Sequence, residues 1–195
     1  MKSKFFALAL AFGAASAAQA ADFSFSGDIA YHNDVIQIPF TLTSDATNVK
    51  VWTDSFLNGV NFDPITAVWN QATGALVGQN DDNGNIAPGQ TRFDSGLVFS
   101  SLAAGEYIFT IATYNNFATG TNINQGFKFD HDAPIALSAW NQPANHPGMG
   151  SHWNVHLTGV DGATPPVPEP ETYAMLLAGL GLLGAVARRK ANKSA

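Results

Sequence analysis

The sequence of 195 residues contains no cysteine. A disulfide framework, a cysteine-based metal site and thiol catalysis are therefore excluded. Basic residues are scarce: residues 21–167 hold only Lys50, Arg92 and Lys128 against thirteen Asp or Glu, a net charge of about −10. Nucleic acid and anionic membranes require clustered Lys and Arg, which this stretch lacks, so we expect no nucleic-acid binding. The charge is compatible with divalent cations or simply with solubility outside a cell.

Catalytic signatures are missing too. The sequence has no Gly-x-Ser-x-Gly elbow, no His-Glu-x-x-His pair and no phosphate-binding glycine loop. Ser151 adjoins His152, but neighbours on a strand point to opposite faces, so they cannot act together as nucleophile and base. The sequence thus predicts that the protein is not an enzyme.

Residues 1–20 have the pattern of a secretory signal peptide. Lys2 and Lys4 precede an apolar stretch over residues 5–18, and Ala18-Gln19-Ala20 supplies the small-x-small pattern of a cleavage site. We expect cleavage after Ala20 by signal peptidase, and therefore export.

The C-terminal end carries a second targeting pattern. Residues 162–172 form a Pro-rich linker, residues 173–187 are apolar and uncharged, and residues 188–195 form a basic tail. A helix over 173–187 would be about 22 Å long, shorter than the roughly 30 Å hydrocarbon core. We expect a short transmembrane helix that inserts transiently in the inner membrane, with the basic tail in the cytoplasm and the bulk of the chain outside.

The order of a Pro-Glu-Pro motif, an apolar helix and a basic cluster resembles the PEP-CTERM sorting signal of Gram-negative proteins that an exosortase processes. Its motif is Val167, Pro168, Glu169 and Pro170, and its cytoplasmic basic anchor is Arg188, Arg189 and Lys190. The resemblance implies that exosortase cuts near Pro168-Glu169-Pro170. It also implies that the domain reaches the outer surface or the extracellular space.

Residues 21–161 are predicted to form one domain of short strands. Alternating or continuous apolar patterns typical of strands occur at residues 36–42, 49–51, 65–69, 97–102, 107–111, 127–129 and 153–157. Turn residues separate them, and residues 130–151 read as a long loop. Many short strands at even spacing predict an all-β fold, a β-sandwich or jelly roll.

Three segments of this domain, residues 32–42, 49–83 and 100–116, also resemble a known module. In order they contain an Asp before a strand, an Asp-Pro, an Asp-Asp-Asn turn and an Ala-Gly-Glu-Tyr. The scheme is similar to the pre-peptidase C-terminal type of β-sandwich found in a group of PEP-CTERM proteins. The resemblance implies a jelly roll with an accessory, non-catalytic role.

The segment 78–85 is a candidate calcium loop, because calcium prefers several hard oxygen ligands at short range. The candidate ligands are Asp81, Asp82 and Asn83, together with Asp54 and Asp63 from preceding loops. An EF-hand is excluded because Ile86 stands where that motif requires glycine. Two interpretations stay open, a calcium site and a solvated turn, since Asp, Asn and Gly also favour turns for backbone reasons.

Histidine and tryptophan suggest two further sites. His131, His146, His152 and His156, near Asp130 and Asp132, are residue types that bind zinc. If the apolar residues of 153–157 face the core, His152 and His156 share the outer face about 13 Å apart, too far to hold one ion. Surface histidines are therefore the favoured interpretation. Most tryptophans of a small sandwich belong to its core, and Trp140, in a loop-like stretch, is the best candidate for an exposed carbohydrate platform.

Together these patterns predict an exported, exosortase-sorted protein of the cell surface or extracellular matrix with a structural or adhesive role, linked to exopolysaccharide or biofilm. One alternative is a calcium-stabilised carbohydrate-binding module that contacts extracellular polysaccharide. Another is a metal-dependent hydrolase that uses the histidines.

Overall fold

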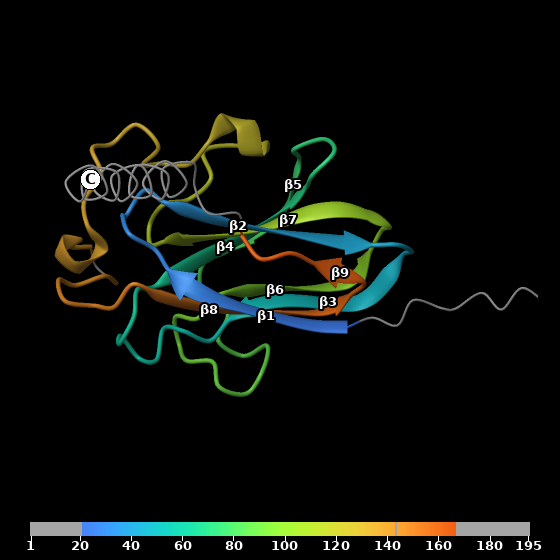
Figure 1. The fold of residues 1–195 in the computed structure, drawn as a ribbon, viewed down its shortest axis with the longest axis horizontal. Coiled ribbons are helices and arrows are strands. Elements are labelled where there is room, and N and C mark those ends of the chain that lie inside the picture. Colours follow the sequence, from blue (N-terminus) through green and yellow to red (C-terminus); the bar gives the residue numbers. More distant parts are fainter. Residues whose placement is uncertain (1–20, 143, 167–195) are drawn as a thin grey trace, which may run out of the picture.

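The computed structural model describes residues 21–142 and 144–166, and these form two antiparallel sheets that pack face to face (Figure 1). One sheet has the order β1-β8-β3-β6, with bounds Ala21–Asp28, His152–Val160, Ala46–Thr53 and Gly96–Leu102. The other has the order β5-β4-β7-β2-β9, with bounds Leu76–Asn80, Pro64–Asn70, Gly105–Thr113, Val35–Leu42 and Gly162–Ala163. The all-β sandwich prediction is confirmed.

Helices are short in the described part of the chain. Two 3-10 helices, η1 (Ile123–Gln125) and η2 (Leu137–Ala139), lie in the connection between β7 and β8. Among the described residues, no helix has the length and apolarity required to span a bilayer. The expected signal peptide (1–20), sorting helix (173–187) and basic tail (188–195) lie outside those residues.

The alternation read from the sequence places the core between the sheets. In β8, Trp153, Val155 and Leu157 are buried and their neighbours are more exposed, because successive side chains on a strand point to opposite faces. In β2 the same pattern buries Ile38 and Phe40. The two inner faces interdigitate, which is the usual packing of a β-sandwich.

Strand β4 is buried on both faces, which explains its continuous apolar sequence. Val68 joins the core between the sheets. Trp69, on the opposite face, is fully buried, donates a hydrogen bond from Nε1 to Thr110 Oγ1 (3.1 Å) and meets Phe127 edge to face at 6.1 Å. The segment after β7 therefore covers the outer face of this sheet.

One predicted strand, at residues 127–129, is wrong. Phe127 forms an isolated bridge with Ala118, and the chain then turns. Phe129 is buried because its ring packs against His32 (5.1 Å) and Trp140 (5.3 Å), inside a cluster of loops. Two apolar residues separated by one polar residue are too short a pattern to distinguish a strand from such a loop.

The described chain begins and ends at the same end of the sandwich, here called the terminal end. Ala21 of β1 pairs with Val160 of β8, and β9 follows directly. β9 pairs with Phe40 and Thr41 of β2, so the sheet continues beyond the domain boundary expected at residue 161. The first residues of the linker expected at 162–172 therefore belong to the sheet, and the Thr164 N–H still donates to the Pro39 carbonyl (3.0 Å).

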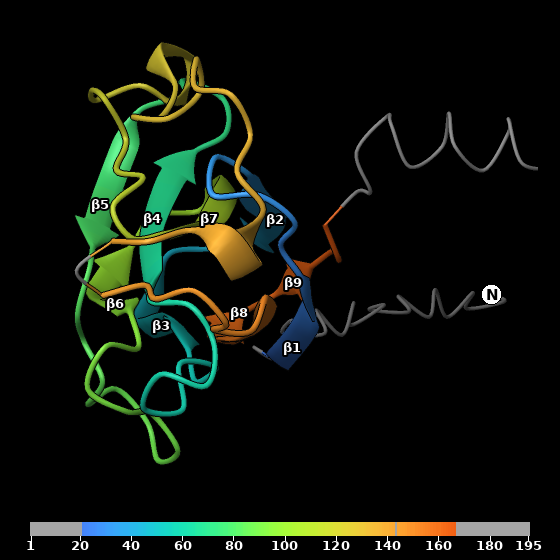
Figure 2. The same ribbon diagram turned by 90° about the vertical axis from the view of Figure 1, so that its left-hand side faces the viewer.

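The long connections lie at the opposite end, here called the distal end. They are residues 54–63, 81–95 and 114–151, which follow β3, β5 and β7. Figure 2 looks onto this end: the orange part of the 114–151 connection crosses in front of the sheets, and the green 81–95 loop extends below them. The connections at the terminal end, such as residues 43–45 and 103–104, are much shorter. Candidate binding groups are thus concentrated at the distal end, as is common when a rigid sandwich carries long loops.

We predict that Leu157→Ala lowers the free energy of unfolding by about 2–5 kcal/mol, because it removes a fully buried side chain and leaves a cavity. The matched control is Leu57→Ala, since Leu57 is 48% exposed, and its effect should stay within about 0.5 kcal/mol. Denaturant unfolding of both variants measures the difference. Equal losses would contradict the assignment of β8 to the core.

Candidate metal centre

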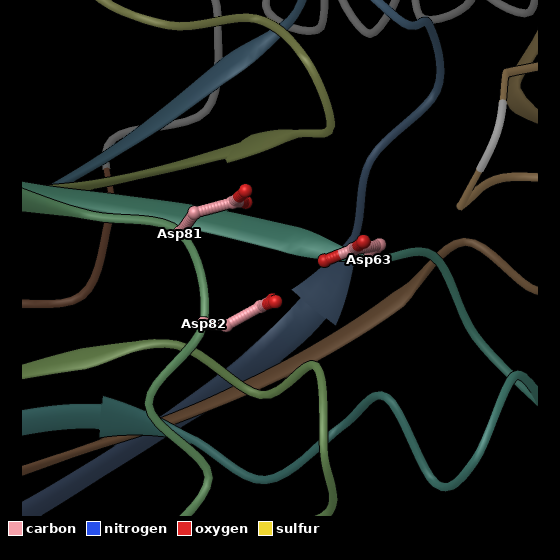
Figure 3. Close-up of side chains that lie close together, drawn as sticks. All are labelled: Asp63, Asp81 and Asp82. Atoms are coloured by element: carbon pink, nitrogen blue, oxygen red, sulfur yellow. The ribbon is translucent and has the colours of Figure 1, made fainter.

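Three aspartates converge at the distal end, where β4 begins and β5 ends. Asp63 immediately precedes β4, and Asp81 and Asp82 immediately follow β5. The two strands pair antiparallel with Thr66 opposite Asn80, so the start of one lies beside the end of the other. Each aspartate offers a carboxylate oxygen, and these oxygens all lie within 4.8 Å of one another (Figure 3).

One oxygen of the Asp63 carboxylate is buried and has no hydrogen-bond partner among the described residues. Asp63 is only 2% exposed, and its Oδ1 atom and that of Asp81 are buried and unpartnered. The backbone of Asp63 is well held: its N–H donates to Asn145 Oδ1 (2.9 Å), and its carbonyl accepts from the Tyr114 N–H (2.8 Å). A buried oxygen without a partner destabilises the fold, so this side chain requires a bound ion, a water molecule or a proton as its partner.

The pKa values of the three aspartates also indicate that the cluster needs a proton or a positive charge. Burial raises the pKa of Asp63 to about 8, with a further contribution from the negative charges of Asp81, Asp82 and Asp94. Burial and then Asp82 raise the pKa of Asp81 to about 6. Burial also raises the pKa of Asp82, although Arg92 opposes that shift. Full ionisation of all three groups at neutral pH is therefore unfavourable unless a positive charge joins them.

Of the five predicted calcium ligands, the structure brings together Asp63, Asp81 and Asp82. Asp54 lies elsewhere: its Oδ2 is 2.9 Å from His156 Nε2, and its Oδ1 accepts from Asn154 Nδ2 (2.7 Å). The expectation that Asp54 joins the calcium set is corrected, because these two partners already occupy its carboxylate.

The fifth predicted ligand, Asn83, is held toward β6. Its backbone N–H donates to the Asp94 carbonyl (2.8 Å), and its side-chain Nδ2 donates to the Gly96 carbonyl (3.4 Å). Asn145, which positions Asp63, was missed by sequence reasoning. It lies 82 residues away in a loop, and no local pattern connects the two.

A second polar cluster lies on the outer face of the β1-β8-β3-β6 sheet. Ser24 Oγ is 2.8 Å from His156 Nδ1, and His156 Nε2 is 2.9 Å from Asp54 Oδ2. Trp52 stacks on the imidazole at 5.2 Å between ring centroids. Sequence reasoning considered Ser151 with His152 and missed this arrangement, because it depends on β8 pairing with β1 on one side and β3 on the other.

The histidines are not assembled into a metal site in the described part of the chain. The metal-compatible group found there contains aspartates alone. His131, His146 and His152 are exposed, while His156 is paired with Asp54. Zinc-dependent hydrolysis by a histidine group thus has no geometric support in these residues.

Trp140 is not an exposed carbohydrate platform but a core residue, as the favoured interpretation of the tryptophans has it. It is 8% exposed, its ring lies 4.1 Å from His32 between centroids, and its Nε1 donates to the Tyr114 carbonyl (3.2 Å). The loop that contains it folds back onto the sandwich, so its large apolar ring becomes part of the core.

We predict that, in the presence of a chelator, Asp63→Asn weakens the pH dependence of stability. Folding raises the pKa of Asp63 from 3.8 to about 8, so the protonated carboxyl favours the folded state. This stabilisation is fully present below about pH 4 and is lost as the pH rises toward about 8. The melting temperature of the wild type should therefore fall more between pH 5 and pH 8 than that of Asp63→Asn. Asp22→Asn, an exposed change on β1, should keep the wild-type slope, and parallel profiles for all three proteins would contradict the prediction.

Comparison with known proteins adds one finding. Residues 166–190 match the PEP-CTERM protein-sorting motif, a range that includes the predicted Pro-Glu-Pro segment and the basic anchor. A search of curated proteins found no match to the chain. The likeness of the sandwich to the pre-peptidase C-terminal type stays a prediction. The chain carries a PEP-CTERM sorting motif and is an exported, surface-directed protein sorted by exosortase.

Proposed function

We propose that the exported sandwich is a non-catalytic structural or adhesive component of the cell surface or extracellular matrix. The observation that carries this proposal is the position of the sorting motif, which starts at residue 166, three residues after β9 ends. The motif is therefore joined almost directly to the sandwich. Sorting of this chain would therefore bring a single β-sandwich domain to the cell surface.

The arrangement of the ends supports a presenting role. The sorting motif is joined to the terminal end, where β9 lies, whereas residues 54–63, 81–95 and 114–151 form the distal end. While the tail holds the precursor at the inner membrane, the distal loops lie on the opposite side of the domain from the attachment. They are the surface that a matrix component would meet first.

The charge of the domain restricts its partners. With thirteen acidic and three basic residues in 21–167, it repels polyanions unless cations mediate the contact. Neutral extracellular polysaccharide and cation-bridged acidic polysaccharide are the compatible partners. A dedicated carbohydrate-binding role is less well supported, because Trp140, its best candidate residue, is buried.

One arrangement favours a second candidate function, hydrolysis by Ser24, His156 and Asp54. In hydrolases of this kind the histidine removes the serine proton and the carboxylate orients the imidazole. The two distances, 2.8 and 2.9 Å, fit these roles. The same contacts have a structural explanation, because they attach the edge strand β1 to β8 and to the end of β3. Ser24 is exposed on the outer face of its sheet, which offers little to position a substrate.

We predict that removal of residues 167–195 changes the final location of the protein, because exosortase then has no motif to recognise. Fractionation of the native host into membrane, surface and medium, followed by immunoblotting, measures the outcome. A variant truncated only after Lys190 keeps the matched segment and should behave as the wild type. An unchanged distribution after the longer deletion would overturn the sorting part of the proposal.

We also predict that a fluorophosphonate probe does not label Ser24, as expected of a non-catalytic domain. Mass spectrometry of the probe-treated exported protein detects labelling at single residues, and Ser24→Ala provides the control. Labelling that is lost in Ser24→Ala and in His156→Ala would replace the structural proposal with the hydrolase.

A further inference from the structure

We propose that Asp63, Asp81 and Asp82 form a binding site for a divalent cation, Ca²⁺, at the distal end of the sandwich. This site is independent of the sorting route and of any matrix partner. Its ligands come from the two strand ends that the β4–β5 ladder holds side by side.

The spacing of the carboxylates is compatible with one bound cation. One oxygen of each of Asp63, Asp81 and Asp82 lies within 4.8 Å of the other two. Oxygens that bind one Ca²⁺ at about 2.3–2.6 Å are up to twice that distance apart, so three oxygens this close can reach the same ion.

Burial of Asp63 is the second and separate observation. A solvated acidic turn directs its carboxylates toward water, whereas Asp63 is 2% exposed and points toward Asp81 and Asp82 (Figure 3). Within the part of the chain that the structure describes, its Oδ1 and that of Asp81 are buried and unpartnered, although buried polar atoms almost always have a partner. Since Asn145 and Tyr114 hold the backbone of Asp63, its carboxylate stays directed into the cluster.

The chemistry of the donors selects the ion. All three ligands are carboxylate oxygens, with no imidazole in the group, which favours a hard cation over zinc. Asp82 is exposed, so one side of the site is open to water molecules that complete six to eight ligands. Mg²⁺ requires a nearly ideal octahedron of ligands and gives up its water reluctantly, which makes Ca²⁺ the better match for an irregular, partly buried site.

A bound cation would connect all three distal segments. Asp63 ends the 54–63 connection, Asp81 and Asp82 begin the 81–95 loop, and Asn145 joins Asp63 to the 114–151 segment. Binding would therefore order the loops as one unit. Since an ion bound only by the folded state stabilises that state by mass action, the stability of the domain becomes dependent on the calcium concentration.

The test is a calcium titration of the exported protein, purified from its host and freed of metal with a chelator. We expect a dissociation constant of about 0.1–1 mM, the range of extracellular calcium modules, and a melting temperature that rises with CaCl₂ above that concentration. Mg²⁺ should give a smaller rise. Tb³⁺, which replaces Ca²⁺, should luminesce on excitation of the protein and be displaced by CaCl₂.

Matched variants assign the ion to these residues. Asp82→Asn changes an exposed ligand and should leave the fold intact while it weakens calcium binding about tenfold or more. Asp63→Asn should remove the response to calcium altogether. Asp22→Asn is the control, because it removes one exposed carboxylate from β1, away from the distal end, and should bind as the wild type.

Three results would overturn the proposal. The first is a folded wild type whose melting temperature and calorimetric heat do not change in 10 mM CaCl₂. The second is an Asp82→Asn variant that binds calcium as tightly as the wild type, which would place the ion elsewhere. The third is tighter binding of Zn²⁺ than of Ca²⁺. None of these results bears on the location of the protein, so the sorting proposal is tested separately.

Discussion

The ladder that joins β4 to β5 and β7 is the interaction on which the candidate site depends. Pairing of Thr66 with Asn80 places Asp63 beside Asp81, and pairing of Pro64 with Thr113 brings the Tyr114 N–H to the Asp63 carbonyl. The two buried faces of β4 carry side chains of very different size, so a slip of one residue would exchange Val68 in the core with Trp69 on the outer face. The acidic cluster is thus positioned by the most buried strand of the domain, although its outermost member is exposed.

Most of the fold could be predicted from the sequence, because β2 and β8 alternate clearly between apolar and polar residues and β4 and β7 are largely apolar. Strand β5 (Leu76–Asn80) was not predicted, since its five residues include a glycine and only two apolar side chains. β1 (Ala21–Asp28) was not predicted either: only its two phenylalanines mark an inner face, and the strand becomes recognisable through its partner β8. The failure at 127–129 has the opposite cause, since local alternation there is overridden by tertiary packing.

The residue types in the sequence identified Asp63, Asp81 and Asp82 as candidate ligands, but they could not show that Asp54 is bound to other partners. The distinction depends on a contact between residues 102 positions apart, the pairing of Asp54 with His156. It arises because β8 lies between β1 and β3 in the sheet. The burial of Trp140 was equally inaccessible, since polar neighbours in its loop resemble those of an exposed segment. Local sequence shows which groups are available, whereas long-range pairing decides which of them remain without a partner.

Because basic residues are scarce, the chain has few side chains that could balance the charge of the aspartate cluster. Elsewhere in the domain a buried acid is satisfied internally: both oxygens of Asp94 accept hydrogen bonds, from Thr53 and the Phe56 N–H and from Thr91. Asp63 Oδ1 has no such donor among the described residues, and Arg92, near Asp82, only partly offsets the charge. With three Lys or Arg in residues 21–167, the chain has few internal cations, so the proposed site would take its balancing charge from solution. Binding of a dissolved ion would couple the distal loops to the composition of the surroundings, and such coupling suits a surface component better than a fixed internal salt bridge would.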